Sequence, residues 1–487
     1  MKRWLIVGCL CAVALQSGHP AHVYALDIQV TTNSGGTGGP DCTLRDAITA
    51  ANQDAPSGGC PAGSGADTIL LAAPLYSLSE VDNVTDGPNG LPSIVTAIII
   101  EGAGAAIERL AGAPNFRIFH VGAAGDLRLR SVTVRNGRAP DGVTGNPGGP
   151  GIDGGGIFNA GTLDLETSTV TANMSGNGGV GEHAANGGAG GNGGGIYNTG
   201  NLSIVRSTVD HNRAGDGGSQ FGDGGNGGGI GNVGGDVRLI NSTVSGNVAG
   251  HSSCTGHVGG KSGDGGGLYQ VGGSTTVANA TIVANQVQGG CGPASLLPGR
   301  GGGIFTGAVS PLLIGNSIVA ENVIVFPGGP VPYDCYTDTD LQSRGYNLFG
   351  SGIASCAIGG DTTGNQLAQD PRVGPLQNNG GPTETHALLP GSPAIDAGTP
   401  QPDGGCTDLA GTALTTDQRG EPRPQGPRCD IGAFEATPTP TRAPLLGTGG
   451  LIGSMLMLLC LGWHGLQRRR VVRRGYIPIK EHRVEPE

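Results

Sequence analysis

The stretch that decides the fold is residues 193–215, "GGGIYNTGNLSIVRSTVDHNRAG". Three glycines precede a short run of alternating apolar residues, and an asparagine follows. Close copies of this string begin at residues 154, 227, 265 and 301, and a degenerate copy spans 116–136. Successive full copies therefore start 34–39 residues apart. A period of this length is typical of proteins that are built from stacked structural repeats.

The apolar residues inside each copy alternate with polar ones, as at Leu202, Ile204 and Val209. A period of two predicts strands with one buried face. One copy is too small to close a core, but stacked copies bury a continuous apolar column. We therefore predict a right-handed parallel β-helix with one repeat per turn. Two aliphatic ladders follow from the alignment: Ile157, Ile196, Ile230, Leu268 and Ile304, and Val170, Val209, Val244, Ile282 and Val319.

An asparagine ends the last strand of every copy. These residues are Asn173, Asn212, Asn247, Asn285 and Asn322. Asparagine tolerates left-handed backbone geometry, and its amide both donates and accepts hydrogen bonds. We expect a structural ladder of asparagines at one corner, with the glycine triplets supplying positive φ at the opposite turn. The glycine-rich inserts between copies, such as 174–192, vary in length and share no side-chain pattern, so we expect projecting loops.

The overall composition excludes several classes of protein. Glycine makes up 97 of 487 residues, yet no strict G-X-Y period of collagen is present. Charged residues are 13% of the chain, which is too few for a solvated disordered polymer. The net charge is −11, and Lys261 is the only lysine between the two charged ends of the chain. Such a surface repels phosphates, so we expect no nucleic acid partner.

The two ends of the chain predict export and a membrane anchor. Lys2 and Arg3, an apolar run and a small-residue site at 23–25 predict a signal peptide over 1–25. The alternative of lipoprotein cleavage before Cys9 would leave too short an apolar stretch. Residues 445–467 carry no charge and would span about 35 Å as a helix, enough for one membrane crossing.

Arginines open the tail at 468–487, so we expect the tail to be cytoplasmic and the large N-terminal part to lie outside the cell. The proline- and threonine-rich residues 437–444 are typical of a stiff stalk. The string "LLGTG" at 445–449 is an alternative signal for sortase processing, but leucine stands where that signal needs proline.

Cysteine usage agrees with an exported chain. Eight cysteines remain in the predicted ectodomain: Cys42, Cys60, Cys254, Cys291, Cys335, Cys356, Cys406 and Cys429. Eight cysteines allow 105 connectivities, so the sequence alone does not assign them. Our hypothesis is that neighbours pair as 42–60, 254–291, 335–356 and 406–429, because each pair closes one local loop.

Three sets of motifs resemble bacterial surface proteins. The elements "GGGI" (227–230) and "VSGN" (244–247) resemble the GGA[ILV] and FxxN repeats of polymorphic outer membrane proteins, which are surface adhesins; this likeness covers 117–323. The string "CTLRDAITAAN" (42–52) resembles the CSLREA motif found near the start of bacterial surface proteins. We expect residues 26–116 to form the N-terminal cap and first coils.

A third likeness lies in 324–436. Its strings are "GYNLFG" (345–350), "DPRVGPLQNNGGPTETHALLPGSPAIDAG" (370–398) and "DQRGEPRPQGPRCDIGAFE" (417–435). They resemble the choice-of-anchor Q module, which sits after exported β-helix repeats and before varied surface anchors. None of these resemblances implies a catalytic site.

Parallel β-helices often cleave acidic polysaccharides, so an enzyme has to be weighed. Such enzymes need acids that converge on one strand face. The two faces tested are Thr171, Asp210, Ser245, Val283 and Ala320, and the next positions, Ala172, His211, Gly246, Ala284 and Glu321. Asp210 with His211 is the one ionisable pair, and we interpret it as a solvated pair at a turn. Asp338 and Asp340 share a face but fall in a cysteine-flanked loop.

The sequence also contains candidate metal ligands. His251, Cys254 and His257 have plausible zinc spacing, but a disulfide at Cys254 is favoured outside the cell. Asp153, Asp223 and Asp264 precede glycines and faintly resemble calcium-binding repeats; turn formation explains them more simply. The sequons at Asn83, Asn173, Asn201, Asn241 and Asn279 are weak, and we expect no glycan that matters.

The sequence therefore predicts an all-β, pectin-lyase-like solenoid with a single C-terminal transmembrane helix. We expect a non-enzymatic surface protein with a structural or adhesive role, without cofactor, metal or catalytic residue. Its expected partners are the membrane and surface glycans or matrix proteins. The alternative is a carbohydrate-active β-helix enzyme, either a polysaccharide lyase or a glycosidase.

Overall fold

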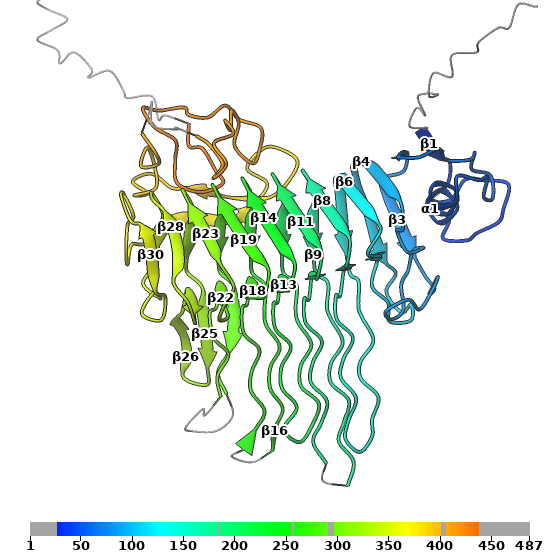
Figure 1. Cartoon of the computed structure of the whole chain (residues 1–487), viewed down its shortest axis with the longest axis horizontal. Helices are drawn as coiled ribbons and strands as arrows, with labels where there is room; N and C mark the ends of the chain where they lie inside the picture. The colour runs from blue at the N-terminus through cyan, green and yellow to red at the C-terminus, as the bar shows by residue number, and fades with distance from the viewer. Residues whose placement is uncertain (1–26, 184, 256–257, 291–296, 401–405, 438–487) are drawn as a thin grey trace, which may run out of the picture. The chain divides into compact units, whose positions relative to one another are not determined.

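The computed structural model describes residues 27–183, 185–255, 258–290, 297–400 and 406–437, and Figure 1 shows their arrangement. Within these ranges the chain forms one α-helix and 32 strands. Two sheets of stacked strands run along the repeat region. The second sheet contains β5 (Phe119–Val121), β7 (Ile157–Asn159), β10 (Ile196–Asn198), β13 (Ile230–Val233), β18 (Leu268–Val271), β22 (Ile304–Thr306) and β27 (Cys335–Thr337).

The first sheet is larger and holds two strands from most coils. Its members are β1 (Asp27–Val30), β2 (Asp67–Leu71), β3 (Leu75–Leu78), β4 (Ala97–Arg109), β6 (Asp126–Arg135), β8 (Thr162–Glu166), β9 (Thr169–Thr171), β11 (Asn201–Val205), β12 (Thr208–Asp210), β14 (Asp236–Ile240), β15 (Thr243–Ser245), β19 (Ser274–Ala278), β20 (Thr281–Val283), β23 (Leu312–Gly315), β24 (Ile318–Ala320), β28 (Leu341–Arg344), β29 (Leu348–Phe349) and β30 (Ile358–Asp361).

Small antiparallel pairings lie outside the two main sheets. They are β16 (Cys254–Thr255) with β17 (Val258–Gly259), β25 (Val323–Phe326) with β26 (Gly329–Pro332), and β31 (Val373–Gln377) with β32 (Thr385–Leu388). The strand β21 (Gln286–Gln288) pairs in parallel with β25.

Both main sheets pair strands in parallel between successive repeats. Ile196 lies opposite Ile157 on one side and Ile230 on the other, and the register continues to Leu268 and Ile304. The second predicted ladder pairs in the same way. All ten side chains are at most 1% exposed and belong to one hydrophobic cluster. The predicted parallel β-helix is therefore confirmed, whereas its right-handed coiling stays a prediction.

The helix α1 (Leu44–Gln53) lies at the N-terminal end of the stack. Thr43 caps it by accepting a hydrogen bond from the backbone N of Asp46 at 3.1 Å. Ala47 and Ile48 are fully buried on its inner face and join the aliphatic column. The string "CTLRDAITAAN" thus forms a lid that shields the first coil from water.

The asparagine ladder forms as predicted at the corner after β9, β12, β15, β20 and β24. Asn212 Nδ2 donates to Asn247 Oδ1 at 3.0 Å, and Asn212 Oδ1 accepts from the backbone N of Asn173 at 3.0 Å. The same bonds repeat down the column until Asn322 donates to Asp334 instead. All five asparagines are at most 1% exposed, so the ladder satisfies polar groups inside the stack.

The asparagines at this corner do not themselves adopt the left-handed conformation that this residue tolerates. Positive φ falls on the residue before each one, namely Ala172, His211, Gly246, Ala284 and Glu321. The asparagine side chain needs a backbone position from which it can reach the next coil, and the residue before it absorbs the bend. At the opposite turn the first glycine of each triplet has φ between 62° and 70°, as expected.

A second amide ladder was not anticipated. Asn159, Asn198, Asn232 and Gln270 occupy the third position of successive strands of the second sheet, and each asparagine donates to the next amide at 2.6–2.7 Å. The strings "IFN", "IYN", "IGN" and "LYQ" carry this signal in the sequence. Both ladders use one polar residue per coil at a fixed position, so their spacing follows the same period.

The glycine-rich inserts project from one edge of the stack, as expected, but they pack together as an ordered layer (Figure 1). We call residues 139–153, 175–183, 185–192, 214–226, 249–255 and 258–264 the glycine layer. Within it the outgoing limb of each insert bonds to the outgoing limb of the next, as in Gly178 N to Asp216 O at 2.8 Å. Returning limbs pair likewise, and bonds such as Gly188 N to Gly179 O at 2.9 Å join the two limbs.

The inserts also share a pattern that the sequence analysis missed. Gly187, Gly190 and Gly193 donate in turn to residues 220, 223 and 226 of the next coil, so the repeat is three residues. Three residues per turn is the period of polyproline II, in which glycine fits where chains approach closely. A Cβ atom at Gly215 would lie 1.8 Å from the carbonyl O of Gly176, and one at Gly188 would lie 1.8 Å from that of Gly149. Close approach explains why this chain needs so much glycine.

Three of the four predicted disulfides are formed: Cys42–Cys60, Cys335–Cys356 and Cys406–Cys429. The proposed partner of Cys254, Cys291, lies outside the described residues. The predicted signal peptide, most of the stalk, the membrane segment 445–467 and the basic tail also lie outside them. In the described ranges no helix has the length and hydropathy to cross a bilayer.

Replacing Asn212 by Leu should destabilise the β-helix without affecting any chemistry. The change strands the carbonyl O of Val170 and the backbone N of Asn173, both of which bond to this amide in a buried corner. Each unsatisfied buried group costs about 1–3 kcal/mol, so we expect a loss of at least about 2 kcal/mol in the free energy of unfolding. Denaturant titration measures it. The exposed Asn201→Leu is the control, and equal stability of both variants would contradict the ladder.

Gly215→Ala should be destabilising by about 1–3 kcal/mol, because the new methyl group overlaps the carbonyl of Gly176. Gly39→Ala is the matched control, since a Cβ atom there meets nothing within 4 Å. Thermal unfolding of the two variants tests whether the glycine layer is close-packed. If Gly215→Ala has the same melting temperature as the wild type, the glycine layer is not close-packed at this position.

Candidate functional site

The chain turns back after β30 and covers part of its own stack. Residues 366–400 and 406–436, together called the returning segment, lie against β12, β15 and β20 (Figure 1, yellow to orange). Thr208 Oγ1 donates to the carbonyl O of residue 384 at 2.8 Å, and Thr243 Oγ1 donates to Gln418 Oε1 at 2.7 Å. Outward hydroxyls of the first sheet thus bind the returning segment, coil after coil.

Apolar contacts reinforce this docking. A second hydrophobic cluster joins four stack residues, Val283, Ile318, Ala320 and Leu348, to four of the returning segment, Leu388, Ala394, Ile431 and Phe434. The stack residues are fully buried, although their strand positions face outward. The returning segment therefore adds a second core on the outside of the β-helix.

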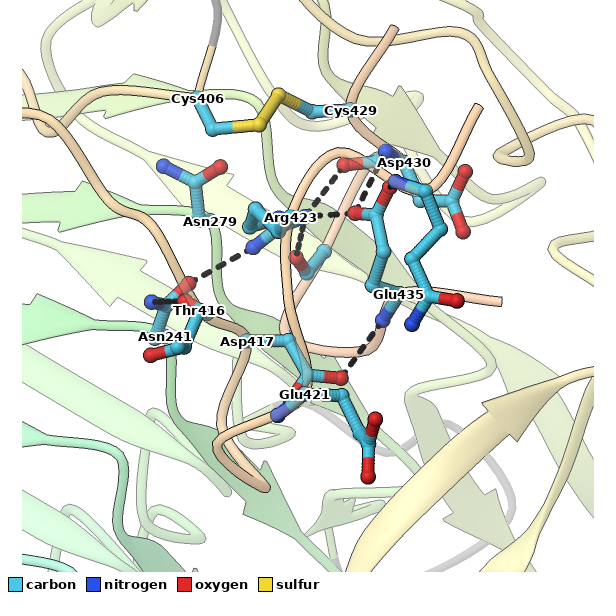
Figure 2. A network of polar contacts seen from close by, with 12 residues as sticks. Asn241, Asn279, Cys406, Thr416, Asp417, Glu421, Arg423, Cys429, Asp430 and Glu435 are labelled. Atoms are coloured by element: carbon cyan, nitrogen blue, oxygen red, sulfur yellow. Dashed lines mark hydrogen bonds and ion pairs between the residues drawn. A yellow bond between two sulfur atoms is a disulfide. The ribbon is translucent and has the colours of Figure 1, made fainter. Parts of the chain in front are cut away.

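A buried arginine lies at the centre of the docked segment (Figure 2). Arg423 Nε bonds to Glu435 Oε2 at 2.9 Å, and Nη1 donates to Asn241 Oδ1 of the stack at 2.8 Å. Its Nη2 donates to the carbonyls of Asp430 and Gly432. The arginine side chain is 0% exposed and that of its glutamate partner 1%. Four acceptors on one guanidinium tie the segment's fold to the stack.

Carboxylates surround this centre. Asp417 Oδ2 accepts from the backbone N of Glu435 at 3.0 Å, and Arg419 bonds to the same oxygen. Burial raises the pKa of Asp430 to about 6, and the charge of Glu435 adds to the shift. The motif "DQRGEPRPQGPRCDIGAFE" therefore builds an internal polar network, which the Cys406–Cys429 disulfide adjoins (Figure 2).

Three asparagines on neighbouring coils complete the attachment. Asn241, Asn279 and Asn316 have φ of 46–51°, and each Nδ2 donates to a carbonyl of the returning segment at 2.8–2.9 Å. Two of them are the sequons considered above, and both are at most 2% exposed. Sequence analysis missed this row because its partners lie more than a hundred residues away along the chain.

The strand face tested for catalysis is largely covered. Ser245, Val283 and Ala320 are at most 2% exposed beneath the returning segment. Asp210 bonds to His211 Nδ1 at 2.6 Å and to Thr171 Oγ1 at 2.9 Å. The prediction of a solvated pair was wrong for the aspartate, whose side chain is 7% exposed, and right for the histidine, which is 64% exposed. The Asp210 contact raises the pKa of His211, and the charge of Glu384 contributes.

A serine–histidine contact also lies in this interface. Ser245 Oγ is 2.8 Å from His386 Nε2, and His386 Nδ1 is 2.7 Å from the carbonyl O of Gly374. Burial lowers the pKa of this histidine. Both side chains are buried, so no substrate reaches them, and the pair acts as a bond between stack and segment.

The residues considered above as metal ligands or acids bond to other groups of the protein where they are described. Among the described residues no group of three His, Cys, Asp or Glu side chains is placed to hold a metal ion. His257 lies outside them, and His251 Nδ1 bonds to the carbonyl O of Ser252. Asp153 and Asp223 accept backbone N–H groups of the next coil, and Asp264 pairs with Lys261 and Arg300. Asp338 lies 3.8 Å from Arg300, and Asp340 lies between β27 and β28.

The part of the first sheet formed by β8, β11, β14 and β19 stays open. Two shallow hollows of about 260 and 240 Å³ adjoin there and share Asp164 and Ser203. Their further polar lining is Asn201, Asp236, Arg238, Ser274 and Thr276 in the larger hollow, and Arg128 and Glu166 in the smaller. We call this surface the open face. It offers hydroxyl, amide and charged groups at the spacing of successive coils.

Comparisons with known proteins add little to this geometry. No family model matches the chain, and no curated protein matches it. Among solved structures, the crystal structure of pectate lyase Pel9A is similar with 13% sequence identity and a TM-score of 0.39, over 85% of this chain and 98% of that one.

Replacing Arg423 by Ala should loosen the returning segment. The change leaves Glu435 as a buried carboxylate without its arginine, and such a loss costs about 3–5 kcal/mol. We expect faster proteolysis within the returning segment at a protease concentration that spares the wild type. Arg428→Ala, at an exposed position of the same segment, is the control. Wild-type resistance of Arg423→Ala would show that the segment stays docked without this centre.

Proposed function

We propose that this chain is a cell-surface β-helix that binds an extended glycan along its open face without cleaving it. One observation carries the proposal. The chain covers β12, β15, β20 and β24 with its own returning segment, while the neighbouring strands β8, β11, β14 and β19 keep a polar surface in contact with solvent.

The lining of the open face suits a polyhydroxylated ligand. Ser203, Asn201 and Thr276 offer neutral donors and acceptors, and Asp164 and Arg238 offer charged ones. Successive coils repeat at about 4.8 Å, close to the length of one sugar unit in an extended polysaccharide. A linear polymer that runs along the stack would meet a similar set of polar groups at each coil.

The charge pairing favours binding over cleavage. Arg130 bonds to Glu101 and Glu166 at 2.8 and 3.1 Å, and Arg206 bonds to Glu166 at 2.8 Å. Arg128 likewise holds Asp164 at 2.8 Å. A lyase or glycosidase needs a carboxyl group free to exchange protons with its substrate. The three carboxylates above are held by arginines, and Asp236, the remaining carboxylate of the open face, accepts a hydrogen bond from Ser274 Oγ at 2.6 Å.

Exposure outside the cell belongs to the same proposal. The disulfides and the resemblance to surface adhesins and to the choice-of-anchor Q module support it. Residues 1–25 would export the chain, and residues 445–467 would hold it in the membrane with the tail inside. The buried network around Arg423 would keep the exported β-helix compact in surroundings that contain proteases.

A glycan array with the purified protein tests the proposal. We expect binding to at least one linear polysaccharide, and a loss of at least tenfold in affinity for Ser203→Trp, because the indole fills both hollows. Val180→Trp, at an exposed position of the glycine layer, is the matched control and should bind normally.

Two outcomes would contradict the proposal. Unchanged binding by Ser203→Trp would show that the ligand does not bind at the open face. Release of unsaturated uronates or reducing ends from pectin or alginate, lost in Ser203→Trp, would establish the carbohydrate-active enzyme instead.

A further inference from the structure

Three side chains at the N-terminal end of the second sheet form a Ser–His–Asp constellation. His120 is the middle residue of β5, and Ser93 and Asp86 come from the segment between β3 and β4. Ser93 Oγ lies 2.9 Å from His120 Nδ1, and Asp86 Oδ2 lies 3.0 Å from His120 Nε2. Both distances lie in the hydrogen-bond range that joins the nucleophile to the base, and the base to the orienting carboxylate, in serine hydrolases.

The polarity of the three groups fixes the protons. An ionised carboxylate only accepts, so Nε2 of His120 carries the hydrogen in the bond to Asp86. In the neutral imidazole Nδ1 then holds a lone pair and accepts the hydroxyl hydrogen of Ser93. Burial lowers the pKa of His120 and the charge of Arg117 acts in the same direction, while the hydrogen bond to Asp86 opposes them; the net lowering favours this neutral form.

A competing acceptor for the serine lies farther away. Ser93 Oγ is 3.2 Å from Asn83 Oδ1, compared with 2.9 Å from the histidine. That oxygen already accepts from Asn89 Nδ2 at 2.7 Å and from the backbone N of Thr85 at 3.2 Å. The Ser93 hydroxyl therefore donates to His120 Nδ1, which is the closer acceptor and has no second donor among the described residues.

The constellation is accessible and rigidly held. Ser93 is partly exposed and the side chain of Asp86 is 59% exposed, while that of His120 is 3% exposed. Asn52 of α1 donates to the carbonyl O of Ser93 at 2.8 Å. Asp86 holds a φ of 52°, a left-handed conformation that is uncommon outside glycine and recurs at functional sites.

A buried cation adjoins the site. Arg117 is 0% exposed, and its Nη2 donates to the carbonyl O atoms of Asp86 and Asp153 at 2.9 Å. Its Nε is buried, with no hydrogen-bond partner in the described part of the chain. Its guanidinium lies 5.0 Å from the ring centroid of Phe158, which also stacks on His120 at 5.4 Å. This positive charge lies close enough to lower the pKa of His120 and so helps to keep the proposed base neutral.

We propose that Ser93 is a nucleophile for ester hydrolysis, with His120 as its general base and Asp86 as the positioning residue. Ser93 Oγ attacks the carbonyl carbon and passes its proton to His120 Nδ1. The bond to the leaving alcohol breaks, the alcohol takes that proton, and an acyl-serine remains. Water then attacks this ester, gives one proton to His120, and releases the acid as Ser93 regains its hydrogen.

The second Ser–His contact of this protein serves as an internal comparison. Ser245 and His386 are equally close but buried, and a backbone carbonyl takes the place of the aspartate. The proposal therefore predicts reaction at Ser93 and none at Ser245 in the folded protein.

A fluorophosphonate probe on the full chain tests the nucleophile, with mass spectrometry to locate the label. We expect the label on Ser93, no label in Ser93→Ala, and a rate at least tenfold lower in His120→Gln. Ser351→Ala, which changes an exposed serine just after β29, should label like the wild type. A folded protein without label on Ser93, or one labelled at another serine, would overturn the proposal.

Turnover and positioning need a second readout. Hydrolysis of p-nitrophenyl acetate should fall at least tenfold in Ser93→Ala and in Asp86→Asn, and Asp86→Glu should recover part of it because the carboxylate is restored. Equal melting temperatures would show that the variants stay folded. Equal turnover by wild type and Ser93→Ala would overturn the proposal. Neither assay involves glycan binding at the open face, so the two proposals can fail separately.

Discussion

Register between successive coils is the constraint on which the rest of this structure depends. Every coil must deliver an aliphatic side chain to the same two positions, because each chain turn shields only its neighbours from water. Ile196 between Ile157 and Ile230 illustrates the rule, and a slip by one residue would turn the whole set outward. Once this column is in place, polar side chains at fixed offsets such as Asn212 also meet their copies, and their hydrogen bonds reinforce the same register.

Glycine has a second role that is distinct from turn formation. At Gly193 the backbone needs positive φ, whereas at Gly215 and Gly188 the need is for close approach between chains. The three-residue spacing of donors in the inserts brings two layers of backbone into contact with almost no side chain between them. Hydrogen bonds between these limbs replace those that water would otherwise supply, so long segments with few apolar residues can still be ordered.

The repeat pattern was enough to predict the strands, both aliphatic ladders and the asparagine ladder, because each depends on residues that recur at one period. Features made by residues that do not recur could not be predicted in this way. Arg423 meets Asn241 across 182 positions, and His386 meets Ser245 across 141. Ser93, His120 and Asp86 converge only because the coil preceding β4 and the coil containing β5 stack in register. The inserts were misjudged because their period of three was hidden by variable length.

The returning segment changes how the stack of coils can unfold. In a solenoid each coil contacts only its neighbours, so coils can open locally from an end. Here one segment bonds to Thr208, Thr243, Thr281 and Asn316, which lie on four successive coils. Opening any one of these coils therefore also breaks bonds to a segment that holds the other three. The docked segment turns a sum of weak neighbour contacts into one cooperative unit, and it does so on a strand face where solvent access would otherwise be free.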